Sequence, residues 1–209
     1  MNTPAASAEQ CLALAIALVN AGQPERAKLL CEHTLAGHGP HPAVLQLLAV
    51  LCLKQGQLES AASAIAASLK LRPDHLPALL VAGDVARTAG HWQDAERALA
   101  QAVALAPLHV DAWFALALTR HDLRDLAGAE TALRQVLCLV PQRAEAEVNL
   151  GIVLQDAGRI DDALCAYGRA FRLREDSFGR IAHALSAANV GRLWLDLGAL
   201  RTALRHTPA

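Results

Sequence analysis

The sequence lacks an excess of either charge. Among its 209 residues, 19 are Lys or Arg and 20 are Asp or Glu, which gives a formal net charge of −1. Recognition of nucleic acid or of an anionic membrane surface needs a clustered basic face. Also missing is an uncharged apolar run of the roughly 18 to 20 residues that a membrane-spanning helix requires. We therefore expect no nucleic-acid partner and no membrane insertion.

Motifs of enzymes and cofactor sites are absent as well. The chain contains no GxSxG, Walker, GxGxxG or HExxH motif. The adjacent acids Asp161 and Asp162 fall in the expected first turn of a helix, where carboxylates complement the helix dipole rather than form a catalytic pair. We expect no enzymatic activity, no cofactor and no catalytic residue.

What the sequence does have is an internal period of 34 residues. Alanine recurs in this step at Ala27, Ala61, Ala95, Ala129 and Ala163. The same step relates Pro73, Pro107 and Pro141, and also Gly22, Gly56, Gly90 and, after one missed position, Gly158. A fixed period of this length is the sequence mark of a stacked-repeat protein.

Each period reads as two helices joined by a tight turn. Apolar residues spaced three and four apart indicate the helices, and a glycine lets the backbone leave the first helix at positive φ. A proline then ends the second helix, because it lacks an N–H and clashes with the preceding turn. In the fourth period Arg124 stands in the glycine position. If that turn keeps its left-handed residue, the substitution costs about 1–2 kcal/mol.

The repeats resemble the tetratricopeptide repeat (TPR) family. The copy at 144–177 carries Leu150, Gly151, Gly158, Ala163, Tyr167 and Ala170 at the family's positions, and the copy at 110–143 carries Trp113, Leu116, Ala117, Ala129 and Pro141. The resemblance implies an all-α fold, a right-handed α-solenoid of stacked antiparallel helix hairpins. We expect five units, at 8–41, 42–75, 76–109, 110–143 and 144–177. Residues 1–7 are expected to be disordered, although Ser7 and Gln10 have the spacing of a capping box that opens the first helix.

Residues 178–209 leave the repeat pattern and are expected to form C-terminal helices. Phe178, Ile181 and Leu185 share one face of the first of these, and Asp196 is expected to cap the last. Solenoids need an end unit that shields the last hairpin. The first interpretation is therefore that residues 178–209 form this cap. The alternative is a docking or dimerising segment that uses the apolar residues Leu193, Trp194 and Leu197.

The five cysteines are Cys11, Cys31, Cys52, Cys138 and Cys165, and no CxxC spacing occurs. Isolated thiols on helices behave as small apolar side chains and suit a reducing compartment, so we expect a cytoplasmic protein. Two alternatives remain. The resemblance implies that Cys11 and Cys31 occupy facing positions of one hairpin, where a disulfide would be feasible. Cys31, His33, His38 and His41 are also close in sequence, although their spacing matches no standard zinc motif, and we expect no metal site.

The family binds partners along a concave groove lined by the first helix of each hairpin. The groove positions singled out here are Leu12, Ile16, Val19, Gln46, Val50, Leu53, Asp84, Arg87, Phe114, Leu118, His121, Asp122, Asn149, Ile152 and Gln155. In the first two units they are largely aliphatic, which favours binding of an amphipathic segment. The alternative is that these residues pack between neighbouring hairpins. The family's clamp for a C-terminal carboxylate is missing, with Asn149 alone matching.

The groove positions of units three to five are more acidic. They include Asp84, Asp111, Asp122, Glu145 and Asp156. We expect an acidic stretch there, which would favour a partner segment carrying Arg or Lys.

Three functions fit these features. The first is a non-catalytic scaffold or adaptor that binds a helical or extended segment of a partner protein in its groove. The second is an assembly or secretion chaperone for a dedicated client. The third is a structural homo-oligomer, such as a homodimer, formed through the C-terminal helices.

Overall fold

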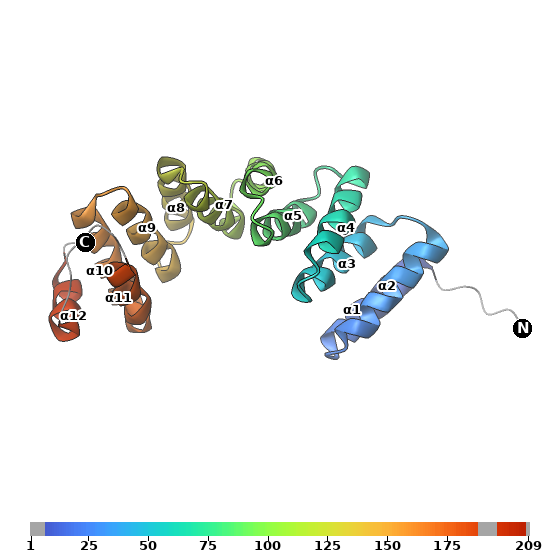
Figure 1. Cartoon of the computed structure of the whole chain (residues 1–209), viewed down its shortest axis with the longest axis horizontal. Helices are drawn as coiled ribbons and strands as arrows, with labels where there is room; N and C mark the ends of the chain where they lie inside the picture. The colour runs from blue at the N-terminus through green and yellow to red at the C-terminus, as the bar shows by residue number, and fades with distance from the viewer. Residues whose placement is uncertain (1–6, 188–195, 208–209) are drawn as a thin grey trace, which may run out of the picture. The chain divides into compact units, whose positions relative to one another are not determined.

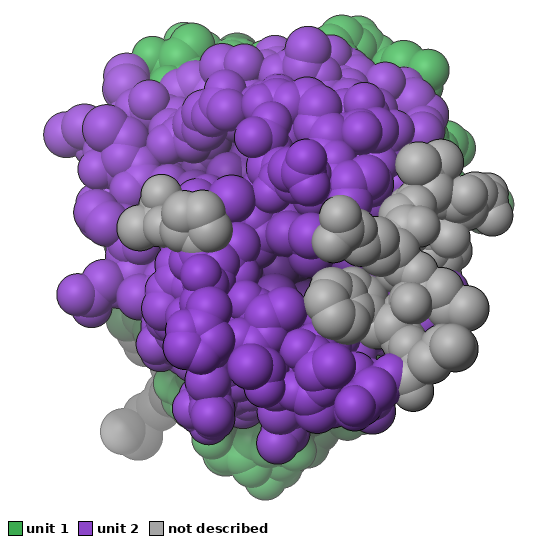
Figure 2. Space-filling model, turned by 90° about the vertical axis from the view of Figure 1, so that its left-hand side faces the viewer, with its two compact units in different colours: residues 1–106 green, residues 107–209 purple. Residues whose placement is uncertain are grey.

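The computed structural model describes residues 7–187 and 196–207 of the chain. These residues form twelve α-helices and one short 3-10 helix, and none of them lies in a strand (Figure 1). The chain divides into two compact units, residues 1–106 and 107–209, which Figure 2 colours separately. The all-helical class predicted from the sequence is confirmed.

The first unit contains three helix pairs in chain order. Their bounds are α1 (Ala8–Asn20), α2 (Pro24–His38), α3 (Pro42–Lys54), α4 (Leu58–Leu71), α5 (Leu76–Thr88) and α6 (Trp92–Leu105). The two helices of each pair pack on each other, and the second helix of one pair packs on the first helix of the next. Each apolar helix face is therefore buried by its neighbours along the chain.

The second unit continues the pattern and then departs from it. Its elements are α7 (Val110–Asp122), α8 (Leu126–Leu139), α9 (Ala144–Asp156), α10 (Ile160–Leu173), the 3-10 helix η1 (Glu175–Ser177), α11 (Phe178–Ala187) and α12 (Leu197–His206). Phe178, Ile181 and Leu185 of α11 are buried in the core of this unit, as their shared face predicts.

The start of α1 corrects one expectation from the sequence. Ser7 was placed in a disordered N-terminus, but it is the N-cap of α1. Its hydroxyl accepts a hydrogen bond from the Gln10 backbone N–H at 3.2 Å, and its own N–H donates to Gln10 Oε1 at 2.9 Å. This reciprocal pair is the capping box that the spacing predicts.

The turns between paired helices need a left-handed residue. Gly22, Gly56, Gly90 and Gly158 have φ of 72°, 72°, 75° and 77°. Arg124 takes the equivalent position with φ 63° and is the one non-glycine residue at positive φ among the described residues. The fourth turn therefore keeps the repeat's geometry at the cost of strain in an arginine.

The alanine ladder lies on the buried faces of the second helices. All five of its members are buried, with at most 1% of their surface exposed. Opposite them, small residues on the first helices admit large side chains from the second. A Cβ added to Gly83 would lie 2.7 Å from Leu99, and one added to Gly151 would lie 2.3 Å from the Tyr167 ring. The repeated small residues thus hold the helices of a hairpin together.

Candidate interaction surfaces

Among the aliphatic groove residues of the first unit, some pack against neighbouring helices and others are exposed to solvent. Ile16 on α1 is 45% exposed. Leu12, Val19 and Leu53 are partly buried against the cores of the unit, and Gln46 and Val50 are also partly buried. Packing between neighbouring hairpins therefore accounts for part of this aliphatic surface, while Ile16 remains open to a partner.

Gln155 is a correction to the predicted groove residues. Its side chain is buried, with 4% exposure. The Tyr167 hydroxyl donates a hydrogen bond to Gln155 Oε1 at 2.8 Å, and Gln155 Nε2 donates to the Ala184 carbonyl at 3.2 Å. Packing of α10 and α11 against α9 encloses this position, because α11 continues the stack where the sequence pattern had ended. Gln155 therefore links three helices and is not available to a partner.

Other predicted residues of the second unit are also engaged internally. Phe114 is partly buried under the Arg143 guanidinium, which lies 4.4 Å from the ring centre. Asn149 Nδ2 donates to the Glu145 carbonyl of its own helix. Ile152 packs on the core, and Leu118 is partly buried. Asp122 is exposed.

The expected acidic stretch is offset by arginines that the groove positions did not include. Asp111 pairs with Arg143 at 2.8 Å, and Glu145 pairs with Arg174 at 2.8 Å. Asp156 receives both the Arg124 guanidinium, at 3.0 Å, and the His121 ring, at 2.8 Å. The pairs of Asp111 and Asp156 join successive hairpins, and that of Glu145 lies within the last hairpin, so most of the predicted negative charge is compensated locally.

Asp84 and Arg87 both lie on α5 in the first unit. Asp84 is exposed, and Arg87 is partly buried. Desolvation raises the pKa of the Asp84 carboxyl, and the charge of Arg87 opposes that shift. The opposite charges of Asp84 and Arg87 on the same helix give this part of α5 little net charge.

The structure describes part of the C-terminal segment. Leu193 and Trp194 lie outside the described residues. Leu197 is the first residue of α12 and is 57% exposed. The same helix buries Leu200 and Leu204 against α10, and the Arg172 side chain of α10 donates to the Leu204 carbonyl at 3.2 Å. By these contacts α12 covers the outer face of the last hairpin.

The cysteines are free thiols in the structure. Burial raises the pKa of the Cys31 thiol to about 11, and burial likewise raises the pKa of Cys52. Within residues 7–187 and 196–207, no three His, Cys, Asp or Glu side chains come together as metal ligands. Nor does any described helix have the length and apolar character to cross a membrane.

An apolar hollow of about 360 Å³ lies between α4, α5 and the start of α6. We call it the α4–α6 hollow. It is lined by Leu58, Ala62, Ile65, Ala66, Leu69, Ala82, Val85, Ala86 and Ala89, with Glu59, His91 and Asp94 at its rim. No residue of this set was among the predicted groove residues.

Small side chains on α5 explain the hollow. In the 34-residue alignment, Ala82 stands where other units have Leu48, Leu116 and Leu150. Ala86 likewise stands in a column whose other members are larger. Each of these alanines is smaller than the other residues of its column, and a close-packed interior does not readily refill such space. The presence of Ala82 in place of a leucine could be seen in the sequence. The size of the resulting hollow, however, depends on how the helices pack.

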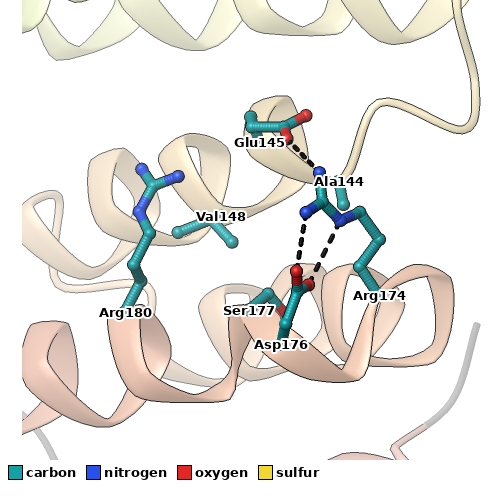
Figure 3. A pocket seen from close by; sticks show the side chains of 7 residues that line it. All are labelled: Ala144, Glu145, Val148, Arg174, Asp176, Ser177 and Arg180. Atoms are coloured by element: carbon teal, nitrogen blue, oxygen red, sulfur yellow. Dashed lines mark hydrogen bonds and ion pairs between the residues drawn. The ribbon is translucent and has the colours of Figure 1, made fainter.

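A second, smaller pocket of about 130 Å³ lies in the second unit (Figure 3). We call it the α9–α11 pocket. Its lining is Ala144, Glu145 and Val148 from α9, Arg174, Asp176 and Ser177 around η1, and Arg180 from α11. The sequence had placed Glu145 in the acidic stretch of the groove.

Solved structures share this fold. MamA from Desulfovibrio magneticus RS-1 (residues 41 to the end) matches with a TM-score of 0.76 and 21% identity, over 81% of this chain and 96% of that one. A thermophilic TPR protein of Thermus thermophilus matches with a TM-score of 0.62 and 24% identity, over 86% and 100% of the two chains. At these identities the likeness concerns the fold. No curated protein sequence matches significantly.

Sequence models of the tetratricopeptide repeat cover most of the chain. One matches residues 18–82, and another matches residues 80–147 and 121–180. These ranges contain the helix pairs, the alanine ladder and the left-handed turns described above. The chain therefore belongs to the tetratricopeptide repeat family.

Proposed function

We propose that this protein is a non-catalytic interaction scaffold that binds an amphipathic segment of a partner protein through its first unit. The observation that carries the proposal is the α4–α6 hollow. Nine of its twelve lining residues are aliphatic, and it opens on the surface of a stacked-hairpin unit. Apolar hollows of this kind are favourable sites for the aliphatic side chains of a bound helix.

Other aliphatic side chains of the first unit are also exposed. Ile16 on α1 and Leu29 on α2 are 45% and 65% exposed. Exposed apolar residues that occur singly are common, so these two support the proposal only together with the hollow. The Glu59 carboxylate at the hollow favours a segment that also carries a basic residue, whereas Asp94 is already paired with Arg97 of its own helix.

Site-specific photo-crosslinking in a native extract tests the proposal. A photoreactive residue at Ala62, inside the hollow, is expected to capture a defined partner, whereas one at the exposed Glu25 of α2 is the matched control. The purified partner should then bind the wild-type chain and lose most of its affinity for Ala82→Leu, in which the added side chain occupies the hollow. Equal binding to Ala82→Leu and wild type would contradict the proposal.

The two alternatives give different results in the same material. A dedicated chaperone would capture its client only before the client assembles, so the crosslink would disappear in extracts where the client is fully assembled. A homo-oligomer formed through the C-terminal helices would dissociate in the variant Leu197→Lys, as measured by light scattering. The exposed position of Leu197 allows this change without loss of the fold.

A further inference from the structure

A second hollow lies on the other flank of α4 from the α4–α6 hollow. Its volume is about 490 Å³, and we call it the α2–α4 hollow. Its buried side is formed by α3, and its other sides are formed by α2 and α4. The residues that the argument uses are Lys28, Glu32, Leu45, Leu48, Ser63 and Ala67. Helix α4 packs on α3 and α5, and its two remaining flanks face α2 and α6 across the two hollows.

The crest of α4 between the two hollows is low. Ala62, Ser63 and Ala66 are exposed and small. Ala62 and Ala66 line the α4–α6 hollow, and Ser63 lines the α2–α4 hollow. The distance at which two helices pack depends on the side chains at their contact. Small residues on the crest therefore let another helix approach α4 closely, and the two hollows leave room for the side chains on either side of that contact.

Glu59 lines both hollows and is exposed. Among residues 7–187 and 196–207 it has no hydrogen-bond or ion-pair partner. At the α2–α4 hollow Glu32 pairs with Lys28 at 3.9 Å, and at the α4–α6 hollow Asp94 pairs with Arg97. The partial positive charge at the start of α4, about half an elementary charge, offsets only part of the Glu59 charge. One carboxylate between the two hollows is thus left to attract a basic side chain.

We infer that one α-helix of the partner crosses α4 on this surface, with an aliphatic side chain in each hollow and a basic side chain between them that pairs with Glu59. The inference rests on the proposed function for the α4–α6 hollow. It adds the second hollow, the helical form of the partner segment and the spacing of its contact residues.

The width of α4 sets that spacing. The two flanks of a helix lie about 10 Å apart. In a crossing helix, residues i and i+7 share one face and are about 10.5 Å apart along the axis, and residue i+4 lies between them. In an extended segment, residues on one side are about 6.6 or 13 Å apart, so no pair spans the crest as well. The pattern expected in the partner is aliphatic at i, basic at i+4 and aliphatic at i+7.

Methyl NMR of the full-length chain, titrated with a synthetic helix, tests the inference without a known partner. The probe is a stapled, alanine-based helix of about 18 residues that carries leucine at i and i+7 and arginine at i+4. The methyl groups of Ile65 report on the α4–α6 hollow, and those of Leu48 report on the α2–α4 hollow. We expect both signals to shift saturably with one shared dissociation constant, at or below about a millimolar.

Changes in the probe test its form and spacing. Replacing either leucine by alanine should weaken binding at least about tenfold, because several methylene groups leave a hollow. Moving the second leucine to i+5 takes it off the common face and should have the same effect. An unstapled probe with a central proline cannot remain helical and should not bind. Equal binding of the proline probe or of the i+5 probe would overturn the assignment to a crossing helix.

Changes in the chain test the two hollows and the charge. Ala67→Leu fills the α2–α4 hollow and Ala82→Leu fills the α4–α6 hollow. Each should weaken binding at least about tenfold, as loss of the leucine it displaces does. Ala127→Leu, at an exposed position of α8 in the second unit, is the matched control and should bind as wild type does. Glu59→Gln should weaken binding of the arginine probe about two- to fivefold and leave a probe with glutamine at i+4 unaffected.

The outcomes separate this inference from the proposed function. Absence of a saturable Leu48 shift, or equal binding to Ala67→Leu and wild type, would overturn the crossing helix, whereas a loss in Ala82→Leu alone would leave the proposed function standing. If Ala67→Leu does not fold, the probes that lack one leucine decide the same point on the wild-type chain. The proposed function itself fails only if the partner captured at Ala62 binds Ala82→Leu as it binds wild type.

Discussion

Replacing Tyr167 by phenylalanine removes one hydroxyl from the core of the second unit and tests the assignment of Gln155 to that core. The hydroxyl donates to Gln155 Oε1 at 2.8 Å, and both residues are buried. Burial also raises the pKa of the phenol well above its usual range, so the group remains a donor at neutral and moderately alkaline pH. The change leaves the Gln155 oxygen without its donor inside the protein. We expect a loss of about 1–3 kcal/mol in the free energy of unfolding.

The complementary change Gln155→Met keeps the size of the side chain but removes both polar atoms. The Tyr167 hydroxyl and the Ala184 carbonyl then lose their partner, and the expected loss is again about 1–3 kcal/mol. The double variant lacks both the Tyr167 hydroxyl and the Gln155 amide, so neither is left without the other. Its loss should be smaller than the sum of the single losses by about 1 kcal/mol or more, which is the coupling of two residues in direct contact.

Urea unfolding of the four proteins, followed by circular dichroism, measures this cycle. If Tyr167→Phe changes stability by less than about 0.3 kcal/mol, or the two losses simply add, the buried hydrogen bond does not form and the reasoning fails. The same variants should bind the captured partner as wild type does, because Gln155 lies inside the protein.

Three other changes have defined outcomes. Ala82→Leu places methyl and methylene groups in the α4–α6 hollow, and thermal unfolding should show a gain of about 1–2 kcal/mol; a loss would mean that the hollow is closed. Gly151→Ala puts a Cβ 2.3 Å from the tyrosine ring and should cost about 1–3 kcal/mol, whereas Gly179→Ala meets no atom within 4 Å and should stabilise α11 by up to about 1 kcal/mol. With a pKa of about 11, Cys31 carries about a hundredfold less thiolate at pH 8 than a thiol of pKa 9. In alkylation followed by mass spectrometry, the exposed Cys138 should therefore react first, and Cys31 should become reactive as the pH rises toward 11; prompt labelling of Cys31 at pH 8 would contradict its burial.

The repeat columns could be predicted because each of them answers a local or nearest-neighbour requirement. An alanine is needed where paired helices approach closely, and a left-handed residue is needed where the chain reverses. Arg124, which replaces a glycine, meets the same requirement, because it adopts a left-handed φ of 63°. These requirements recur in every hairpin, so the sequence repeats them and one copy can be compared with another.

The candidate surfaces could be predicted much less well. Gln155 occupies a groove position by spacing, yet α11 lies beside α9 and encloses it. The expected acidic stretch failed for a similar reason, because Arg143 and Arg174 reach the acids from positions outside the groove pattern. Exposure and net charge depend on which side chains meet across helices, and position within a repeat does not specify that.

The sequence by itself determined the helix pairs, their turns, the buried alanine ladder and the family, because these follow from short-range sterics and a fixed period. Tertiary structure alone decided where space and charge remain. The α4–α6 hollow exists because Ala82 faces a gap that no neighbouring side chain of the described residues fills. In the α9–α11 pocket a single arginine, Arg174, contacts both Glu145 of α9 and Asp176 of η1. Volume and charge balance are sums over residues that are distant in sequence, and only their packing brings those residues together.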